Sequence, residues 1–273
     1  MRILITGSGG RLGRLLYAAR QLEGVPGAEV VFQSRSAGRD VQWQPGAPVA
    51  QLPDCDALVA LWGATSGSAE DLAVNARLVA LSRQVAQECG AQMVFHLSSA
   101  AVYGPGARLA ETARLAPRTP YGTAKVEMER RVREGGAGVQ ECVLRLANVV
   151  GADSLAVALT SNGAVTLDRF EDGRGPMRSY IGATDLLRVL SALAKAETDS
   201  LPFALNIAAA APVGMDDLAR AAGKRVTWRT APAQAVQEVS LDTGLMQSLL
   251  PAVRPTSDAG ALIAGLTALE RVA

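Results

Sequence analysis

The sequence predicts an α/β fold of the Rossmann type, a doubly wound parallel sheet with a small C-terminal substrate lobe. Two observations predict it. Short, nearly continuous apolar runs alternate with longer amphipathic runs in the first half of the chain, and a glycine-rich turn follows the first apolar run. Apolar runs of this kind are typical of strands that are buried on both faces. Their alternation with helices implies right-handed crossovers between parallel strands.

The individual elements follow from these patterns in chain order. The aliphatic runs predict strands at residues 3–6, 30–33, 57–62, 93–97 and 143–146. Helices are expected at 10–22 and 70–88, where apolar residues recur three and four positions apart, and at 120–132. Beyond these, residues 148–176 are expected to be mostly loop. The remaining predicted elements are a short strand near Val165, a strand at 203–207, and helices at 184–195, 214–222 and 258–270.

The chain of 273 residues is expected to form two unequal parts. Residues 1–148 are predicted to be a dinucleotide-binding Rossmann domain. Residues 149–273 are predicted to be a smaller substrate-side lobe, with segments at about 179–208 returning to the first domain. Such a lobe would cover the carboxyl edge of the sheet, where open α/β sheets bind their ligands.

Composition excludes several classes of protein. Hydrophobic residues make up 49% of the chain and charged residues 19%, which excludes a disordered chain. A net charge of +1 without a basic block disfavours a nucleic-acid partner. One histidine and three scattered cysteines give no metal site, and no apolar run is long enough to cross a membrane. The six residues before the first glycine are too few for a signal peptide, so a cytoplasmic location is expected.

The glycine-rich turn has the spacing G-x-x-G-x-x-G, at Gly7, Gly10 and Gly13. In this position the three glycines let the backbone turn tightly, approach a pyrophosphate and pack the helix against the strand. The phosphates would then lie at the positive end of the helix dipole. The alternative is that the turn binds no ligand. The position of the turn between a strand and a helix, however, favours a bound dinucleotide. The predicted cofactor contacts here are Gly7, Gly10, Arg11, Leu12 and Gly13.

The end of the second strand indicates which dinucleotide binds. An acidic residue is expected there when the adenosine ribose has a free 2′-hydroxyl, but the sequence reads Gln33-Ser34-Arg35-Ser36. Ser34 can hydrogen-bond a phosphate, and Arg35 can supply a planar, permanently charged fork. The sequence therefore predicts NADP as the cofactor, with NAD less favoured. The alternative is that Arg35 is a solvated surface residue.

A possible acid–base pair stands at Tyr121 and Lys125, which lie on one face of a helix because they are four residues apart. A nearby cation favours a phenolate, so Lys125 is expected to lower the pKa of Tyr121 from its usual value near 10. This spacing alone is a common coincidence. Ser98 and Ser99, however, end a predicted strand at the same edge, where a serine can hydrogen-bond a substrate oxygen. Asn75 either braces this site or is an ordinary exposed helix residue.

Together these motifs resemble the extended short-chain dehydrogenase/reductases, also called the NAD-dependent epimerase/dehydratase family. The resemblance covers nearly the whole chain and is specific for the family. It is weakly informative on the substrate. The matching segments are the turn at residues 7–13, Leu61-Trp62-Gly63-Ala64, Ser98-Ser99-Ala100-Ala101-Val102-Tyr103-Gly104, residues 111–125, Leu144-Arg145-Leu146-Ala147-Asn148-Val149-Val150-Gly151 and residues 178–186.

The resemblance implies roles for particular residues. Tyr121 would be the acid–base residue, Lys125 its partner and ribose contact, and Ser99 the hydrogen-bonding residue next to the substrate. These three are the predicted catalytic set.

By the same resemblance, Ser98 would lie beside the nicotinamide, and Trp62 and Gly63 would contact the cofactor. Asn148 and Arg178 match positions that contact the diphosphate of the substrate in sugar-nucleotide members. The helices at 70–88 and 120–132 are the family's usual pairing faces, so a homodimer is expected.

The expected function is that of an NADP-dependent oxidoreductase acting on a small-molecule substrate. Hydride would move to or from a carbon bearing oxygen while Tyr121 exchanges the proton. The missing acidic residue favours a reductase, because NADP more often serves net reduction. One alternative is a sugar-nucleotide epimerase or dehydratase with a tightly bound cofactor. A second alternative is a non-catalytic protein that senses NADP(H).

Overall fold

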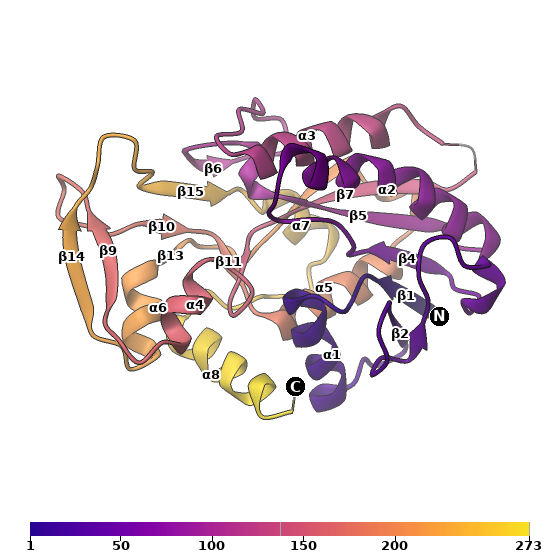
Figure 1. Cartoon of the computed structure of the whole chain (residues 1–273), viewed down its shortest axis with the longest axis horizontal. Coiled ribbons are helices and arrows are strands. Elements are labelled where there is room, and N and C mark those ends of the chain that lie inside the picture. Colours follow the sequence, from indigo (N-terminus) through magenta and orange to yellow (C-terminus); the bar gives the residue numbers. More distant parts are fainter. Residues whose placement is uncertain (137, 273) are drawn as a thin grey trace.

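A seven-stranded parallel sheet forms the centre of the computed structural model, which describes residues 1–136 and 138–272 (Figure 1). Its strand order is β12-β7-β5-β4-β1-β2-β3, so the chain winds outward from β1 in both directions. This is the doubly wound arrangement that the sequence predicts. The strands are β1 (Arg2–Thr6), β2 (Glu29–Ser34), β3 (Val41–Gln42), β4 (Ala57–Ala60), β5 (Met93–Ser99), β7 (Gln140–Leu146) and β12 (Ala204–Ile207).

Helices cover both faces of this sheet (Figure 1). On one face Leu16 and Phe32 belong to a large buried apolar cluster, and on the other Met128 packs with Val143. Burial on both faces explains why the strands read as continuous apolar runs. The helices of the first face are α1 (Arg11–Glu23), α5 (Ala183–Ala194) and α8 (Ala259–Glu270), and those of the second are α2 (Ala69–Glu88) and α3 (Pro120–Arg133).

Smaller sheets, built by the second half of the chain together with β6 from the first half, lie beside the main one, at the left of Figure 1. One has the order β13-β10-β15-β6, and β9 pairs with β14 and β8 with β11. These strands are β6 (Gly106–Leu109), β8 (Asn148–Val149), β9 (Val165–Arg169), β10 (Met177–Arg178), β11 (Tyr180–Ile181), β13 (Val213–Gly214), β14 (Val226–Thr230) and β15 (Glu238–Leu241). The helices among them are α4 (Leu155–Thr160), α6 (Met215–Ala221) and α7 (Gly244–Leu249).

The long predicted elements are found within a few residues of their expected bounds, and the short strand expected near Val165 is β9. The loop expected around it, at 148–176, is wrong in part because that segment also contains β8 and α4. Strand β12 pairs with β7, which places part of the returning segment in the main sheet. The domain boundary at residue 148 stays a prediction. Within the described ranges, no helix combines the length and apolar character needed to cross a membrane.

Candidate active site

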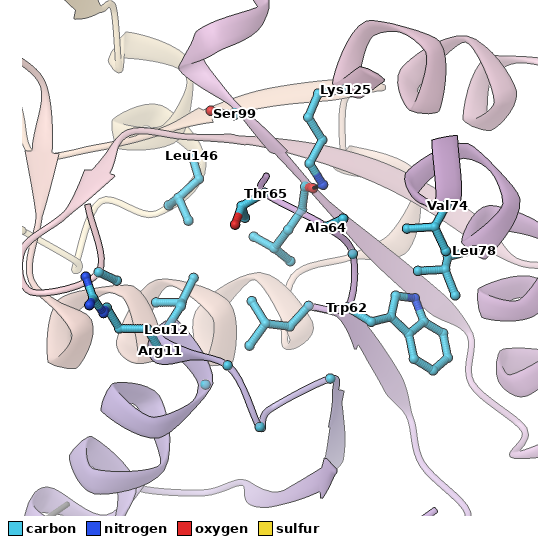
Figure 2. Close-up of a pocket in the computed structure, with 18 of the residues that line it drawn as sticks. Arg11, Leu12, Trp62, Ala64, Thr65, Val74, Leu78, Ser99, Lys125 and Leu146 are labelled. Carbon is cyan, nitrogen blue, oxygen red and sulfur yellow. Dashed lines mark hydrogen bonds between the residues drawn. The ribbon is translucent and has the colours of Figure 1, made fainter. Parts of the chain in front are cut away.

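A pocket of about 980 Å³ lies at the carboxyl edge of the sheet, where the glycine turn, the ends of β4, β5 and β7, and the start of α3 meet (Figure 2). Segments far apart in the sequence come together here because parallel strands all end at one edge. The predicted site residues that line this pocket are Gly7, Gly10, Arg11, Leu12, Gly13, Arg35, Trp62, Gly63, Ser98, Ser99, Tyr121, Lys125 and Asn148.

The three glycines of the turn differ in the space that surrounds them. Gly7 has φ of +74°, and a Cβ there would lie 2.5 Å from Cα of Trp62. A Cβ at Gly13 would lie 2.3 Å from the carbonyl oxygen of Ser8, so only glycine lets the first turn of α1 lie this close to the backbone of the preceding turn. At Gly10 a Cβ would meet nothing within 4 Å. The turn thus leaves open space at the N-terminus of α1, which fits a pyrophosphate.

The end of β2 contributes Arg35 and Ser36 to the pocket wall. The prediction that Ser34 lies at the cofactor is not supported, because its hydroxyl donates to the carbonyl of Ser36 and the residue is not part of the wall. Figure 2 draws Trp62 at the same end of the pocket as Val74 and Leu78, away from Arg11 and Leu12. The side chains of Trp62, Val74 and Leu78 at this end form an apolar surface against which a planar ring of a dinucleotide can pack.

Tyr121 and Ser99 form a hydrogen-bonded pair in the pocket. Burial raises the pKa of Tyr121, and the hydrogen bond from Ser99 opposes this. The expected lowering by Lys125 is therefore wrong for this structure. The reason is geometric: the Nζ atom of Lys125 lies 5.8 Å from the centre of the Tyr121 ring and donates to the carbonyl oxygen of Leu97 at 2.7 Å. At neutral pH Tyr121 is accordingly a proton donor.

Lys125 and Asn75 meet beside Gly63. A Cβ at Gly63 would lie 2.3 Å from Oδ1 of Asn75 and 3.6 Å from Nζ of Lys125. Asn75 is buried, and its Nδ2 donates to the carbonyl oxygen of Ala64 at 3.0 Å. Its Oδ1 is buried without a hydrogen-bond partner among the described residues. Asn75 therefore braces the site, and the alternative of an exposed helix position is wrong.

Ser98 is fixed from behind by a residue that the sequence analysis missed. Its hydroxyl donates to Oε1 of Glu129 at 2.6 Å. Burial lowers the pKa of Lys125 to about 8, and the Glu129 carboxylate opposes this. The sequence feature that could have identified Glu129 is its position, since it is a carboxylate one helical turn after Lys125 and therefore on the same helix face.

On the substrate side, Asn148 lines the pocket together with Asp153, which the sequence analysis also missed. Tyr180 donates to Oδ2 of Asp153 at 3.2 Å, while burial raises the pKa of this carboxyl. Arg178 is not in the pocket wall, contrary to its predicted role. Its guanidinium is held by three backbone carbonyls, those of Met177 at 2.7 Å, Val236 at 2.8 Å and Gln237 at 2.9 Å.

His96 lies 2.8 Å from a carboxylate oxygen of Glu141 in the core, and burial lowers the pKa of its imidazole. Over residues 1–136 and 138–272, no group of three or more histidine, cysteine or acidic side chains is arranged to hold a metal ion.

Comparison with known proteins agrees with this arrangement. The family model described as the NAD dependent epimerase/dehydratase family matches residues 3–208. No curated protein matches the chain.

Solved structures share the fold at low sequence identity. The ADP-L-glycero-D-manno-heptose-6-epimerase of Helicobacter pylori is 20% identical, with a TM-score of 0.77 and coverage of 98% of this chain and 96% of that one. The dTDP-glucose 4,6-dehydratase DesIV of Streptomyces venezuelae, solved with NAD, is 20% identical, with a TM-score of 0.75 and coverage of 99% and 97%. MoeE5, solved with UDP-glucuronic acid and NAD, is 19% identical, with a TM-score of 0.77 and coverage of 99% of both chains.

The family model spans most of the chain, and the motifs that carry the match converge on one pocket. The protein thus belongs to the NAD dependent epimerase/dehydratase family and is an enzyme of the short-chain dehydrogenase/reductase or epimerase type.

Proposed function

We propose that the protein moves a hydride to and from an oxygen-bearing carbon of a nucleotide-linked sugar, as an epimerase or dehydratase with a bound nicotinamide dinucleotide. One observation carries the proposal: Ser99, Tyr121 and Lys125 line the same pocket as the glycine turn. The comparisons support this alternative better than the reductase that the sequence analysis favours, since the similar structures described above include an epimerase and a dehydratase.

The residues around the glycine turn suit the cofactor. Open space at Gly10 admits a pyrophosphate beside the first amide groups of α1, and Arg11 adds a positive charge there. When bound, the nicotinamide ring supplies the acceptor and donor of the hydride.

Side chains of the protein would donate and accept the proton that accompanies hydride transfer. Tyr121, protonated at neutral pH and hydrogen-bonded by Ser99, is placed to give its phenolic proton to a developing oxyanion. The reverse step needs the same phenol as a proton acceptor, and the hydrogen bond from Ser99 favours that form. A charged Lys125, in the same pocket wall, would hold the ribose hydroxyls of the cofactor beside Tyr121. Asn148 and Asp153 offer an amide and a carboxyl to the hydroxyl groups of the substrate.

A second candidate is an NADPH-dependent reductase, and the β2 end specifically favours it. Arg35 and Ser36 face the pocket, and no carboxylate stands between Gln33 and Ser36 to hold a free 2′-hydroxyl. We retain NADP as the proposed cofactor for this reason, although the similar structures that name a cofactor were solved with NAD. The cytoplasmic location and the homodimer also stay predictions.

The two candidates differ in whether the cofactor is consumed. Purified protein would be incubated with UDP-, dTDP- and ADP-linked sugars and each of the four nicotinamide dinucleotides, and followed by absorbance of the reduced cofactor and by mass spectrometry of the sugar. An altered sugar without net change in the cofactor supports the main proposal. Oxidation of NADPH in proportion to product supports the reductase. Binding of cofactor without any turnover contradicts both and favours a sensor.

A further inference from the structure

Glu129 is a buried carboxylate on α3 that lies directly behind the predicted catalytic residues. It is 3% exposed. Ser98 donates to its Oε1 at 2.6 Å, and Arg145 on β7 donates to its Oε2 at 2.8 Å. A carboxylate held from both sides in this way is paired and fixed in position.

Glu129 and Lys125 connect the same two elements. The Lys125 ammonium donates to the carbonyl oxygen of Leu97 at 2.7 Å, and Glu129 accepts from Ser98, the next residue of β5. Because they are four residues apart, Lys125 and Glu129 lie on one face of α3. The helix that carries Tyr121 is thus joined by two polar contacts to the end of the strand that carries Ser99.

Glu129 is also the carboxylate that acts on the charge of Lys125. The other titratable groups facing this ammonium are Tyr121 on α3, which is protonated, and His96 on β5, which is neutral because burial lowers its pKa. Asn75 on α2 contributes only a neutral amide. A buried ammonium loses its hydration, so a nearby anion is needed to keep the proton on it.

We propose that Glu129 is a positioning residue of this site, whose carboxylate keeps Lys125 charged and holds Ser98 in place beside Ser99. The role rests on the proposed function, in which a charged Lys125 is needed beside Tyr121. The state of Lys125 itself is measurable without any substrate, so the two ideas can fail separately.

The chain offers a direct measurement, because lysine occurs only at positions 125, 195 and 224. Protein labelled with ¹³C at the lysine Cε position would be titrated by NMR. Lys195 and Lys224 donate to the exposed backbone carbonyls of Pro26 and Ser161 and serve as internal references. In Glu129→Gln, the titration midpoint of Lys125 is expected to fall by about one pH unit, with both references unchanged.

A matched control is Glu141→Gln. Glu141 also accepts hydrogen bonds from an arginine and from a β5 side chain, Arg83 and His96, but it makes no contact with Ser98 or Lys125 among the described residues. Its loss is expected to leave the midpoint of Lys125 unchanged.

Glu129→Gln removes the carboxylate that balances the charge of the buried Arg145, which keeps its hydrogen bonds to Tyr103 and Glu111, and can impair folding. The double variant Glu129→Gln/Arg145→Gln removes both charges and is compared with Arg145→Gln, which keeps Glu129, because loss of the Arg145 cation by itself raises the Lys125 midpoint. The midpoint is expected to be lower in the double variant than in Arg145→Gln. An unchanged midpoint in both comparisons, Glu129→Gln with the parent and the double variant with Arg145→Gln, or an equal fall in Glu141→Gln, would overturn the proposal. If the midpoint shifts as expected while no sugar nucleotide is turned over, only the proposed function fails.

Discussion

Alanine at Gly10 and at Gly13 should separate cofactor binding from folding at the same turn. At Gly13 the added Cβ would lie 2.3 Å from the oxygen and 2.4 Å from the Cα of Ser8. These are backbone atoms of the β1–α1 turn, which cannot rotate away as a side chain can. Overpacking typically costs about 1–3 kcal/mol, and contact with backbone places Gly13→Ala near 3 kcal/mol. For a chain of this size that corresponds to a fall in Tm of about 6–12 °C.

Gly10→Ala should behave in the opposite way. Its φ of −73° and ψ of 176° suit alanine, and the new Cβ meets nothing within 4 Å, so stability should change by less than about 1 kcal/mol. The methyl group would, however, occupy space that the account assigns to the pyrophosphate. NADPH affinity should therefore fall at least about tenfold, which corresponds to 1.4 kcal/mol.

Both variants are compared by thermal unfolding and by NADPH fluorescence titration. The reasoning about the turn is refuted if Gly10→Ala binds NADPH as tightly as the parent protein, or if Gly13→Ala unfolds at the parent's temperature.

Two further predictions concern cofactor choice and pH. Arg35→Ala should weaken NADPH binding at least about tenfold and leave NADH binding nearly unchanged, because a guanidinium fork recognises the 2′-phosphate alone; equal losses for both cofactors in parallel titrations would count against NADP. Asp40, whose side chain accepts from Arg20 and from the Phe32 amide, has a lowered pKa: burial raises it, but these partners outweigh burial. Ionised Asp40 thus stabilises the folded protein at pH values above its unfolded pKa near 3.8, and this stabilisation is lost as the pH falls below that value. Urea unfolding should show Asp40→Asn less stable than the parent at pH 7, with the difference vanishing toward pH 3, and a constant difference would contradict this.

Much of the fold follows from local sequence patterns. The strands β1, β4 and β5 each contain a nearly continuous apolar run because both their faces are buried, which gives a strong signal in a short segment. In contrast, β8 and β10 contain two residues each, and their pairing with β11 and with β13 and β15 depends on contacts distant in the chain. No local pattern specifies such strands.

The candidate site likewise combines residues that local motifs predict with residues whose roles depend on contacts distant in the chain. The glycine turn and the Tyr121–Lys125 pair are local motifs, so the sequence predicted that they line one pocket. Ser34 and Arg178 were predicted from their residue type and their place in a motif, but both side chains donate to backbone carbonyls, that of Ser36 and those of Met177, Val236 and Gln237, and the motif does not encode these contacts. Glu129 was missed because its importance depends on Ser98 and Arg145, which approach it only in the folded protein.

The most direct measurement compares Tyr121→Phe with the parent protein under identical conditions, on whichever sugar nucleotide the substrate panel shows to be converted. Product formation is expected to slow by at least about 100-fold, because a general acid–base group is lost, while the dinucleotide binds as before. Product formation at the parent rate, with the phenol removed and the cofactor still bound, would contradict it.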